Sequence, residues 1–399
     1  MRRRPRIATW IPVLATWIAA PAALTGSRPA IADTQFHFHG LLDVVAAERG
    51  AAFESNLLMR GDSPFDGYGL RAFADATLNP RLQVFTQLVL RDATAPYVDG
   101  AYLTFTPQPE RDLHLQAGKQ PWAIGTWAPR TYSDRNPLIG CPLMYQYHST
   151  LLWYEIPPNA DKLLSLSGAG QASTDYFGGQ GRGMAIVDDS YWDVSATLSG
   201  SARPLEYALG VAAGAPSWGS TSEDDNTGKS VLGRLGLAPL PGVRLGVSGA
   251  YGPYLVQGVT KRLPPGKSPD DYPQELGMAD AELLAGHVEL RAEGARNVWK
   301  TPTLGALGVS SGYAELKYAF AFGAYLAGRW DAITFADITD STGARRAWDA
   351  NARRVEAGAG YRFDRNATAK LVWQQTRYGQ PVLGRTRVAL VGAQLSIAF

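Results

Sequence analysis

The sequence predicts an all-β protein, a transmembrane antiparallel β-barrel of about sixteen strands. Apolar and polar residues alternate with a period of two over many segments of about ten residues, the pattern of strands with one apolar and one wet face. The wet faces repeatedly carry full charges. The connections alternate between tight turns and long loops, an asymmetry typical of barrels in an outer membrane.

The first 32 residues have the features of a signal peptide. Four arginines lie within residues 1–6, an apolar run covers residues 7–24, and residues 30–32 have the A-x-A pattern of a cleavage site. We therefore expect export through a cleaved signal peptide, with Asp33 as the first residue of the exported chain. A membrane anchor and a twin-arginine signal are alternatives. Prolines interrupt the apolar run, and the polar residues expected around an arginine pair are missing.

Residues 33–399 show no linker, charge block or low-complexity stretch, so we expect one domain, the barrel itself. The net charge of +2 gives no indication of a nucleic-acid partner. Cys141 is the single cysteine, so no intrachain disulfide supports the fold. No later apolar run reaches the roughly eighteen residues of a transmembrane helix.

The strand pattern can be followed along the whole of this domain. Sixteen strands are predicted to begin near residues 36, 68, 81, 97, 111, 190, 205, 229, 242, 279, 288, 311, 324, 352, 367 and 387. Fourteen and eighteen strands remain alternatives, because residues 279–299 show no clear turn. Reading that stretch as two strands keeps all tight turns on one side of the barrel.

The connections fall into two groups. Tight turns are expected at residues 79–80, 107–110, 201–204, 239–242, 321–323 and 364–366, and long loops at 49–66, 119–190, 214–228, 253–278 and 336–349. We assign the short turns to the periplasm and the long loops to the cell exterior.

The last strand, RVALVGAQLSIAF, has an apolar residue at every odd position from Val391 to Phe399. We expect this face to meet lipid and the strand to pair with the first, because closure leaves every backbone group satisfied. A terminal strand that ends in Phe399 resembles the signature read by the barrel-assembly machinery.

The wet faces supply candidate residues for the lumen. They are Arg71, Asp75, Arg244, Glu289, Arg291, Glu356 and Arg362. With Lys370, Asp99 and Glu293 included, five basic residues stand against five acidic ones, so the wet faces predict no strong preference for anions or cations.

The segment 119–190 is the third external loop and contains WAPRTYSDRNPLIGCPLMYQYHSTLLWYEIPP. A fully solvated loop would not be this aromatic and apolar. We expect it to fold into the lumen and narrow the pore; a cap over the barrel mouth and a contact between subunits are the alternatives. The candidates to face the solute are Arg130, Tyr132, Arg135, Tyr145 and His148.

The segment VDGAYLTFTPQPERDLHLQAGKQ, the order of strands and the ending resemble bacterial outer-membrane porins. The likeness covers residues 35–399 and is greatest to the phosphate-selective-porin-like superfamily. It implies a sixteen-stranded channel, commonly trimeric, with an inward-folded third loop. The basic-rich constriction of a phosphate channel is not found, because acidic residues dilute the basic residues of this loop. No particular substrate is therefore assigned.

The expected function is passive diffusion of small hydrophilic solutes or ions through the outer membrane of a Gram-negative bacterium. The expected partners are outer-membrane lipid and lipopolysaccharide, the barrel-assembly machinery and further copies in a homotrimer. No enzymatic activity, cofactor or metal is predicted; His37 and His39 share a strand face but lack a third ligand. Alternatives are a scaffold barrel that houses a periplasmic or redox partner and, with less support, an outer-membrane enzyme.

Overall fold

The computed structural model describes residues 34–49, 67–91, 95–171, 183–188, 192–218 and 228–399. The predicted signal peptide lies outside these ranges, as does nearly all of the predicted loop 49–66. Within them, no helix is both long enough and apolar enough to pass through a membrane.

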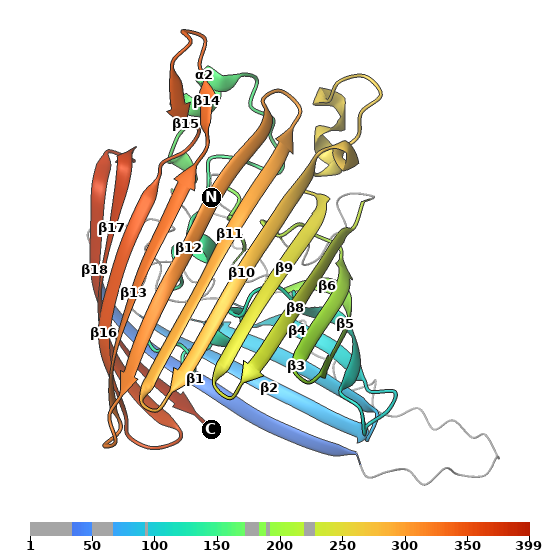
Figure 1. Ribbon diagram of the computed structural model, residues 1–399, viewed down its shortest axis with the longest axis vertical. Coiled ribbons are helices and arrows are strands. Elements are labelled where there is room, and N and C mark those ends of the chain that lie inside the picture. Colours follow the sequence, from blue (N-terminus) through green and yellow to red (C-terminus); the bar gives the residue numbers. More distant parts are fainter. Residues whose placement is uncertain (1–33, 50–66, 92–94, 172–182, 189–191, 219–227) are drawn as a thin grey trace, which may run out of the picture.

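The described strands form a closed antiparallel barrel of sixteen, in which chain neighbours pair and β1 closes against β18 (Figure 1). This confirms the predicted fold and strand number. The barrel strands are β1 (Gln35–Arg49), β2 (Gly67–Asn79), β3 (Leu82–Arg91), β4 (Tyr97–Phe105), β5 (Leu113–Pro121), β6 (Trp192–Ala202), β7 (Leu205–Ala212), β8 (Ser230–Leu240), β9 (Val243–Pro253), β10 (Pro273–Ala285), β11 (Val288–Thr301), β12 (Gly305–Ala319), β13 (Ala324–Phe335), β16 (Ala352–Arg362), β17 (Ala367–Val382) and β18 (Arg385–Ala398).

Two strands are longer than the sequence pattern predicted. Strand β10 begins at Pro273 rather than near 279, and β12 begins at Gly305 rather than near 311. Both extend beyond the stretch with clear apolar alternation. The turn missing from the sequence pattern lies between Ala285 and Val288, where Gly286 has φ +57°, a conformation that glycine adopts without steric cost.

The two ends of the barrel differ as predicted. Tight turns such as those between β6 and β7 and between β8 and β9 lie at the lower end in Figure 1, and long connections lie at the upper end. One long connection, between β13 and β16, contains an additional two-stranded sheet of β14 (Asp337–Thr339) and β15 (Arg345–Ala347). Another contains two short helices, η4 (Gln257–Arg262) and η5 (Pro269–Asp271).

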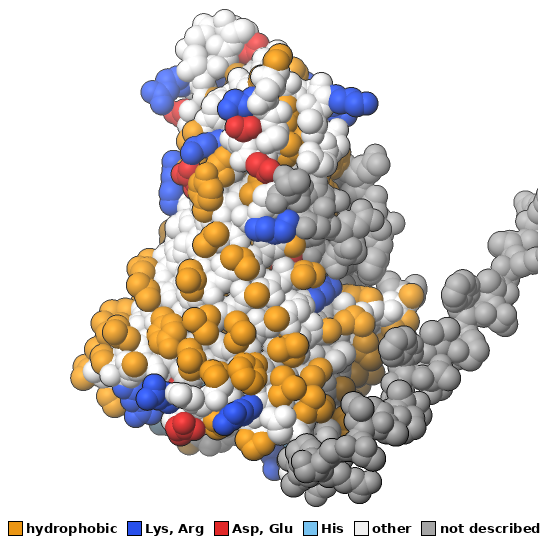
Figure 2. Space-filling model, turned by 90° about the vertical axis from the view of Figure 1, so that its right-hand side faces the viewer, with side chains coloured by type: hydrophobic (Ala, Val, Ile, Leu, Met, Phe, Trp, Pro, Cys, Tyr) orange, Lys and Arg blue, Asp and Glu red, His pale blue; other side chains and the backbone are white. Residues whose placement is uncertain are grey.

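The outer surface carries the apolar residues of the period-two pattern. Phe38, Leu235 and Val247 are 76%, 64% and 56% exposed. Figure 2 shows hydrophobic side chains spread over the lower part of one face, with charged side chains above and below them. An apolar zone bounded by polar ends is the surface that a barrel presents to lipid.

The barrel closes at a seam between β1 and β18. Gly40 and Phe399 exchange backbone hydrogen bonds, with N···O distances of 2.7 and 3.0 Å. The ring of Phe399 lies over Gly40, where an added Cβ would be only 2.5 Å from the ring. Glycine at position 40 is therefore what allows the last aromatic ring to cover the seam.

Candidate pore constriction

The interior of the barrel is filled largely by the connection between β5 and β6. Its short helices are η2 (Ala128–Thr131), α1 (Leu143–Gln146), α2 (Ala160–Ser165) and η3 (Ala169–Gln171). Helix α1 contacts β12 and β13. The side chains of Trp127, Leu143 and Tyr147 have no exposed surface. The loop is therefore packed against the wall of the barrel rather than solvated.

Local sequence explains the short helices of this loop. Proline occupies the first turn of η2, where its missing N–H costs no hydrogen bond. Asn159 caps α2 by accepting a hydrogen bond from the Lys162 N–H at 2.9 Å. Residues 183–188, near the end of the loop, pair with its earlier part. Ala185 forms a β-bridge with His148, and the Ser149 N–H donates to the Met184 carbonyl at 2.8 Å.

Buried carboxylates on the wall accept hydrogen bonds from backbone N–H groups of the loop. Glu356 accepts from Gly140 at 3.1 Å, and Asp331 accepts from Leu143 at 2.9 Å. Glu293 accepts from the backbone and the hydroxyl of Thr126 and from the hydroxyl of Tyr145. Asp349, just before β16, accepts from the N–H groups of Thr150 and Gly168, both at 2.7 Å.

Buried cations on the same wall donate to carbonyl groups of the loop. Arg329 donates to Gly140 O at 2.7 Å, and Arg354 donates to Cys141 O at 3.0 Å. Lys370 donates to Asn136 O at 2.8 Å and also to Ser133 O. Arg329 also pairs with the wall carboxylates Glu315 and Glu356. Charge-assisted bonds of this kind are roughly twice as strong as neutral ones and fix the path of the loop.

Burial also affects two titratable groups at the outer end of this network. It raises the pKa of the Asp349 carboxyl, while hydrogen bonds from the Thr150 and Gly168 N–H groups act in the opposite direction. Burial raises the pKa of Tyr147 well above its usual value, so this hydroxyl remains a donor. It donates to Ala350 O at 3.0 Å.

The five loop residues predicted to face the solute separate into two groups. Tyr145 and His148 are buried within the packed part of the loop, where His148 Nδ1 lies 3.0 Å from Gln146 O. Arg130 is 6% exposed, pairs with Glu315 and lies 4.8 Å from the centroid of the Trp127 ring. These three side chains hold the loop in place, and Arg130 also lines the charged cavity described below. Tyr132 and Arg135 lie where the loop borders open space.

A charged cavity of about 660 Å³ lies between the loop and the wall formed by β7–β12 and β16. We call it the charged passage. Its basic lining residues are Arg130, Arg135, Arg234, Arg244, Arg291, Lys317 and Arg362, and its acidic ones are Asp134, Glu206, Glu282 and Glu289. Four of the seven predicted lumen residues are therefore found here.

The other three predicted lumen residues have different surroundings. Arg71 is buried and lies 3.6 Å from Asp43. Glu356 is buried beneath the loop and pairs with Arg329. Asp75 is partly buried and lies opposite His37 in the pairing of β1 with β2. The period-two pattern identifies the face of the sheet, but it does not tell which part of that face the loop covers.

A second cavity, of about 340 Å³, lies between the loop and the wall formed by β1–β6. We call it the aromatic cavity. Its ring-bearing residues are His39, Phe73, Phe85, Tyr102, Tyr132 and Trp192. It shares Pro129, Asp134 and Arg135 with the charged passage, so the two spaces adjoin at the loop. Sequence reasoning missed this cavity, although Phe73 and Phe85 occupy wet-face positions of their strands and were the available signal.

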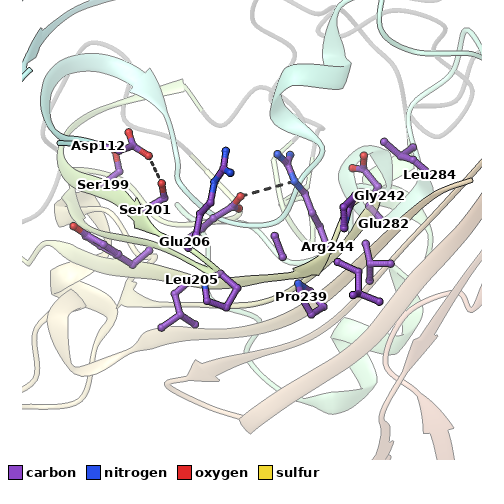
Figure 3. A pocket seen from close by; sticks show the side chains of 18 of the residues that line it. Asp112, Ser199, Ser201, Leu205, Glu206, Pro239, Gly242, Arg244, Glu282 and Leu284 are labelled. Carbon is purple, nitrogen blue, oxygen red and sulfur yellow. Dashed lines mark hydrogen bonds and ion pairs between the residues drawn. The ribbon is translucent and has the colours of Figure 1, made fainter. Parts of the chain in front are cut away.

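A third cavity, of about 940 Å³, lies at the short-turn end (Figure 3). Asp112 accepts a hydrogen bond from Ser201 there, and Arg244 lies 3.8 Å from Glu206. Glu206, Arg244 and Glu282 also line the charged passage, so this cavity is continuous with its short-turn side.

Neither protein-family models nor curated proteins match this sequence. Solved structures do. OmpF of Salmonella typhi, in a complex with daunomycin, has a TM-score of 0.57 at 14% identity and covers 91% of this chain and 97% of its own. An anion-selective porin from Comamonas acidovorans has a TM-score of 0.57 at 11% identity, covering 92% and 100%. The trimer form of Vibrio cholerae OmpT has a TM-score of 0.54 at 14% identity, covering 92% and 99%.

These likenesses place the chain in a structural class. Its fold is that of the general outer-membrane porins, a sixteen-stranded barrel with a long connection after the fifth strand folded inside. The resemblance to porins expected from the sequence is confirmed at this level of fold.

Proposed function

We propose that this protein is an outer-membrane porin that lets small hydrophilic solutes and ions diffuse through its lumen. The observation that carries the proposal is the loop packed inside a closed sixteen-stranded barrel, beside a passage lined with charged side chains. A barrel of this size holds an aqueous channel unless something fills it. Here the loop fills part of the lumen and leaves the charged passage.

The lumen contents favour a channel over a scaffold for a partner protein. The hydrophobic core inside the barrel includes Trp127, Leu143 and Tyr147 of the loop together with Trp299 and Trp348 of the wall side. This core occupies the space that a partner chain would need. We therefore prefer a diffusion channel to a scaffold barrel or an enzyme.

We propose a modest preference for anions. Many charges of the passage are paired, for example Arg234 with Asp280 at 2.5 Å and Lys317 with Glu289 at 2.8 Å. Arg135, Arg244 and Arg362 are exposed on the passage, and the first two have only long ion pairs, of 4.0 and 3.8 Å. Basic side chains that lack a close acidic partner favour anions in a confined lumen. The carboxylates among them argue against extending the proposal to phosphate selectivity.

The remaining parts of the proposal concern export and assembly. We propose that residues 1–32 are removed on export, which N-terminal sequencing of the membrane form would test. We also propose that Phe399 contributes to recognition by the barrel-assembly machinery. A homotrimer is proposed because one structural neighbour, Vibrio cholerae OmpT, is described in a trimer form.

The channel proposal is tested by recording from the purified protein in planar bilayers. Discrete conductance steps in KCl and a reversal potential that indicates anion preference in a salt gradient are expected. Arg135→Glu should shift the reversal potential toward cations. A double change of charge at about 8 Å corresponds to roughly 1 kcal/mol even in water, or roughly fivefold in the permeability ratio.

Lys267→Glu is the matched control, because Lys267 is exposed on the long loop between β9 and β10. It should leave the reversal potential nearly unchanged. An absence of conductance steps would refute the channel, whereas equal effects of the two variants would refute the role of Arg135.

A further inference from the structure

The aromatic cavity is lined by rings that contact one another in an ordered way. The ring centroids of Phe85 and Tyr102 are 4.8 Å apart, and the ring of Trp192 stacks on Phe85 at 6.2 Å with an interplanar angle of 15°. On the other side, the edge of Tyr132 meets Phe73 at 5.7 Å. The cavity therefore offers aromatic surface from both the wall and the loop.

Backbone and polar contacts hold these rings in place. Phe85 and Tyr102 are direct cross-strand partners in the pairing of β3 with β4. Trp192 occupies the space that a side chain at Gly100 would need, since an added Cβ would lie 2.2 Å from its ring. Tyr132 donates its hydroxyl to Gln87 at 2.7 Å. The arrangement is thus a preformed surface, which lowers the cost of binding.

The rings lie in an unusual position for a barrel. Phe73 and Phe85 occupy the inward face of β2 and β3, where an aqueous lumen normally has polar residues. Phe73 is buried, but Phe85 and Tyr102 are partly exposed, and the ring of a passing solute can cover this exposed surface. Stacked or edge-to-face ring pairs gain stability beyond the area they bury.

Arg135 indicates which charge a solute in the aromatic cavity should carry. It lines both the aromatic cavity and the charged passage. Its side chain is 62% exposed, and its ion pair with Asp134 is long, at 4.0 Å. Guanidinium donors therefore remain for a carboxylate that sits at the border between the two spaces.

We propose that the aromatic cavity is a solute subsite for planar organic anions, namely one-ring aromatic carboxylates, whose ring lies against Phe85 and Tyr102 and whose carboxylate meets Arg135. This rests on the proposed channel function and adds a solute class to it. The cavity volume of about 340 Å³ lies at the lower end of the range for small-molecule sites. The subsite selects by ring as well as by charge.

The test measures block of chloride current through single channels in planar bilayers. Benzoate and cyclohexanecarboxylate are the probes, because they share charge and ring size but differ in aromaticity. Benzoate should reach half-block at a concentration roughly three- to tenfold lower, the range expected for one aromatic contact.

Variants test which rings cause the difference in half-blocking concentration between the two carboxylates. Phe85→Leu should bring the two half-blocking concentrations together, and Tyr102→Leu provides an independent second variant if the first does not fold. Arg135→Gln should weaken block by both carboxylates to the same degree. Phe38→Leu is the matched control, since this ring is 76% exposed on the outer face of β1, and it should keep the preference for benzoate.

The outcomes separate the two proposals. If the unmodified protein gives no conductance steps in KCl, the channel function is refuted. If it conducts but both carboxylates block equally, only the subsite is refuted. Stronger block by benzyltrimethylammonium than by benzoate would overturn the anionic assignment and indicate a site for aromatic cations beside Asp134.

Discussion

The two halves of the barrel wall hold the long loop in different ways. The wall formed by β10–β18 binds it through buried charged groups such as Glu293, Arg329 and Lys370. The wall formed by β1–β4 meets it through Tyr132, by a hydrogen bond to Gln87 and a ring contact with Phe73. The loop fills the lumen along the charged wall and leaves a cavity beside the aromatic one.

This difference indicates why the loop packs against one part of the barrel wall and leaves space beside another. Backbone N–H and C=O groups of an irregular loop need partners once water is excluded. Alternating acids and bases on a wall supply both kinds of partner, and their own charges cancel. The rings of Phe73 and Phe85 supply neither, so they do not bind the loop backbone, and open space remains beside them.

The largest effect is expected on the charged wall. Arg329 is fully buried, contacts Glu315 and Glu356 and donates to Gly140 O. Arg329→Gln leaves two buried carboxylates short of a partner, and breaking such a network typically costs about 3–5 kcal/mol. The folded, fast-migrating form on unboiled gels should then be lost at a clearly lower temperature.

Arg353→Gln on the same part of the wall is the control for this change. Arg353 is exposed on β16, so its replacement should leave the transition temperature nearly unchanged. Equal transition temperatures for the two variants would show that the charged wall does not hold the loop.

A smaller effect, on the amount of folded protein, is expected at the seam between β1 and β18, where the two walls meet. Phe399→Ser removes the ring that covers Gly40 but retains the backbone pairing of the seam. The amount of folded protein in the outer membrane should fall, while the conductance of each folded channel should not change, because the ring lies outside the lumen. Quantitative blotting of membrane fractions and single-channel recording measure the two quantities.

Phe322 provides the comparison for the seam. It is 68% exposed, close to the 66% of Phe399, and lies on the tight turn between β12 and β13. If Phe322→Ser reduces folded protein as strongly as Phe399→Ser does, the loss reflects apolar surface in general and not closure of the barrel.

The smallest effect is expected on the aromatic wall. Tyr132→Phe removes the hydrogen bond to Gln87, which still donates to Asp99 at 2.9 Å. One such bond contributes about 1 kcal/mol, so the transition temperature should change little. A decrease as large as that of Arg329→Gln would contradict the contrast between the two walls.

Much of the barrel could be predicted because its strands follow a simple rule. A period of two determines which residues face lipid and which face inward, as it did for Phe38 and Arg71. The short turn near Gly286 was harder, because one glycine in a polar pair gives little signal. The predicted starts of β10 and β12, near residues 279 and 311, were too late for a different reason, since the first residues of both strands extend beyond the lipid-facing pattern.

The site was less predictable because it depends on contacts between distant segments. The loop composition correctly indicated a packed segment, but the same aromatic and basic residues serve different purposes. Tyr145 and Arg130 bind wall carboxylates more than 140 residues away, whereas Tyr132 and Arg135 border the aromatic cavity. Nothing in the local sequence separates these pairs.

Alternation along each strand and the sorting of connections by length determined the barrel, its strand number and its apolar outer face, because these depend on neighbours in the chain. Only the tertiary structure decided where the loop lies, since its path depends on charged partners that lie on or just before six different strands, from Arg234 on β8 to Lys370 on β17. It also decided that inward aromatic residues of β2, β3 and β4 would share one cavity, because strand register alone brings Phe73, Phe85 and Tyr102 together.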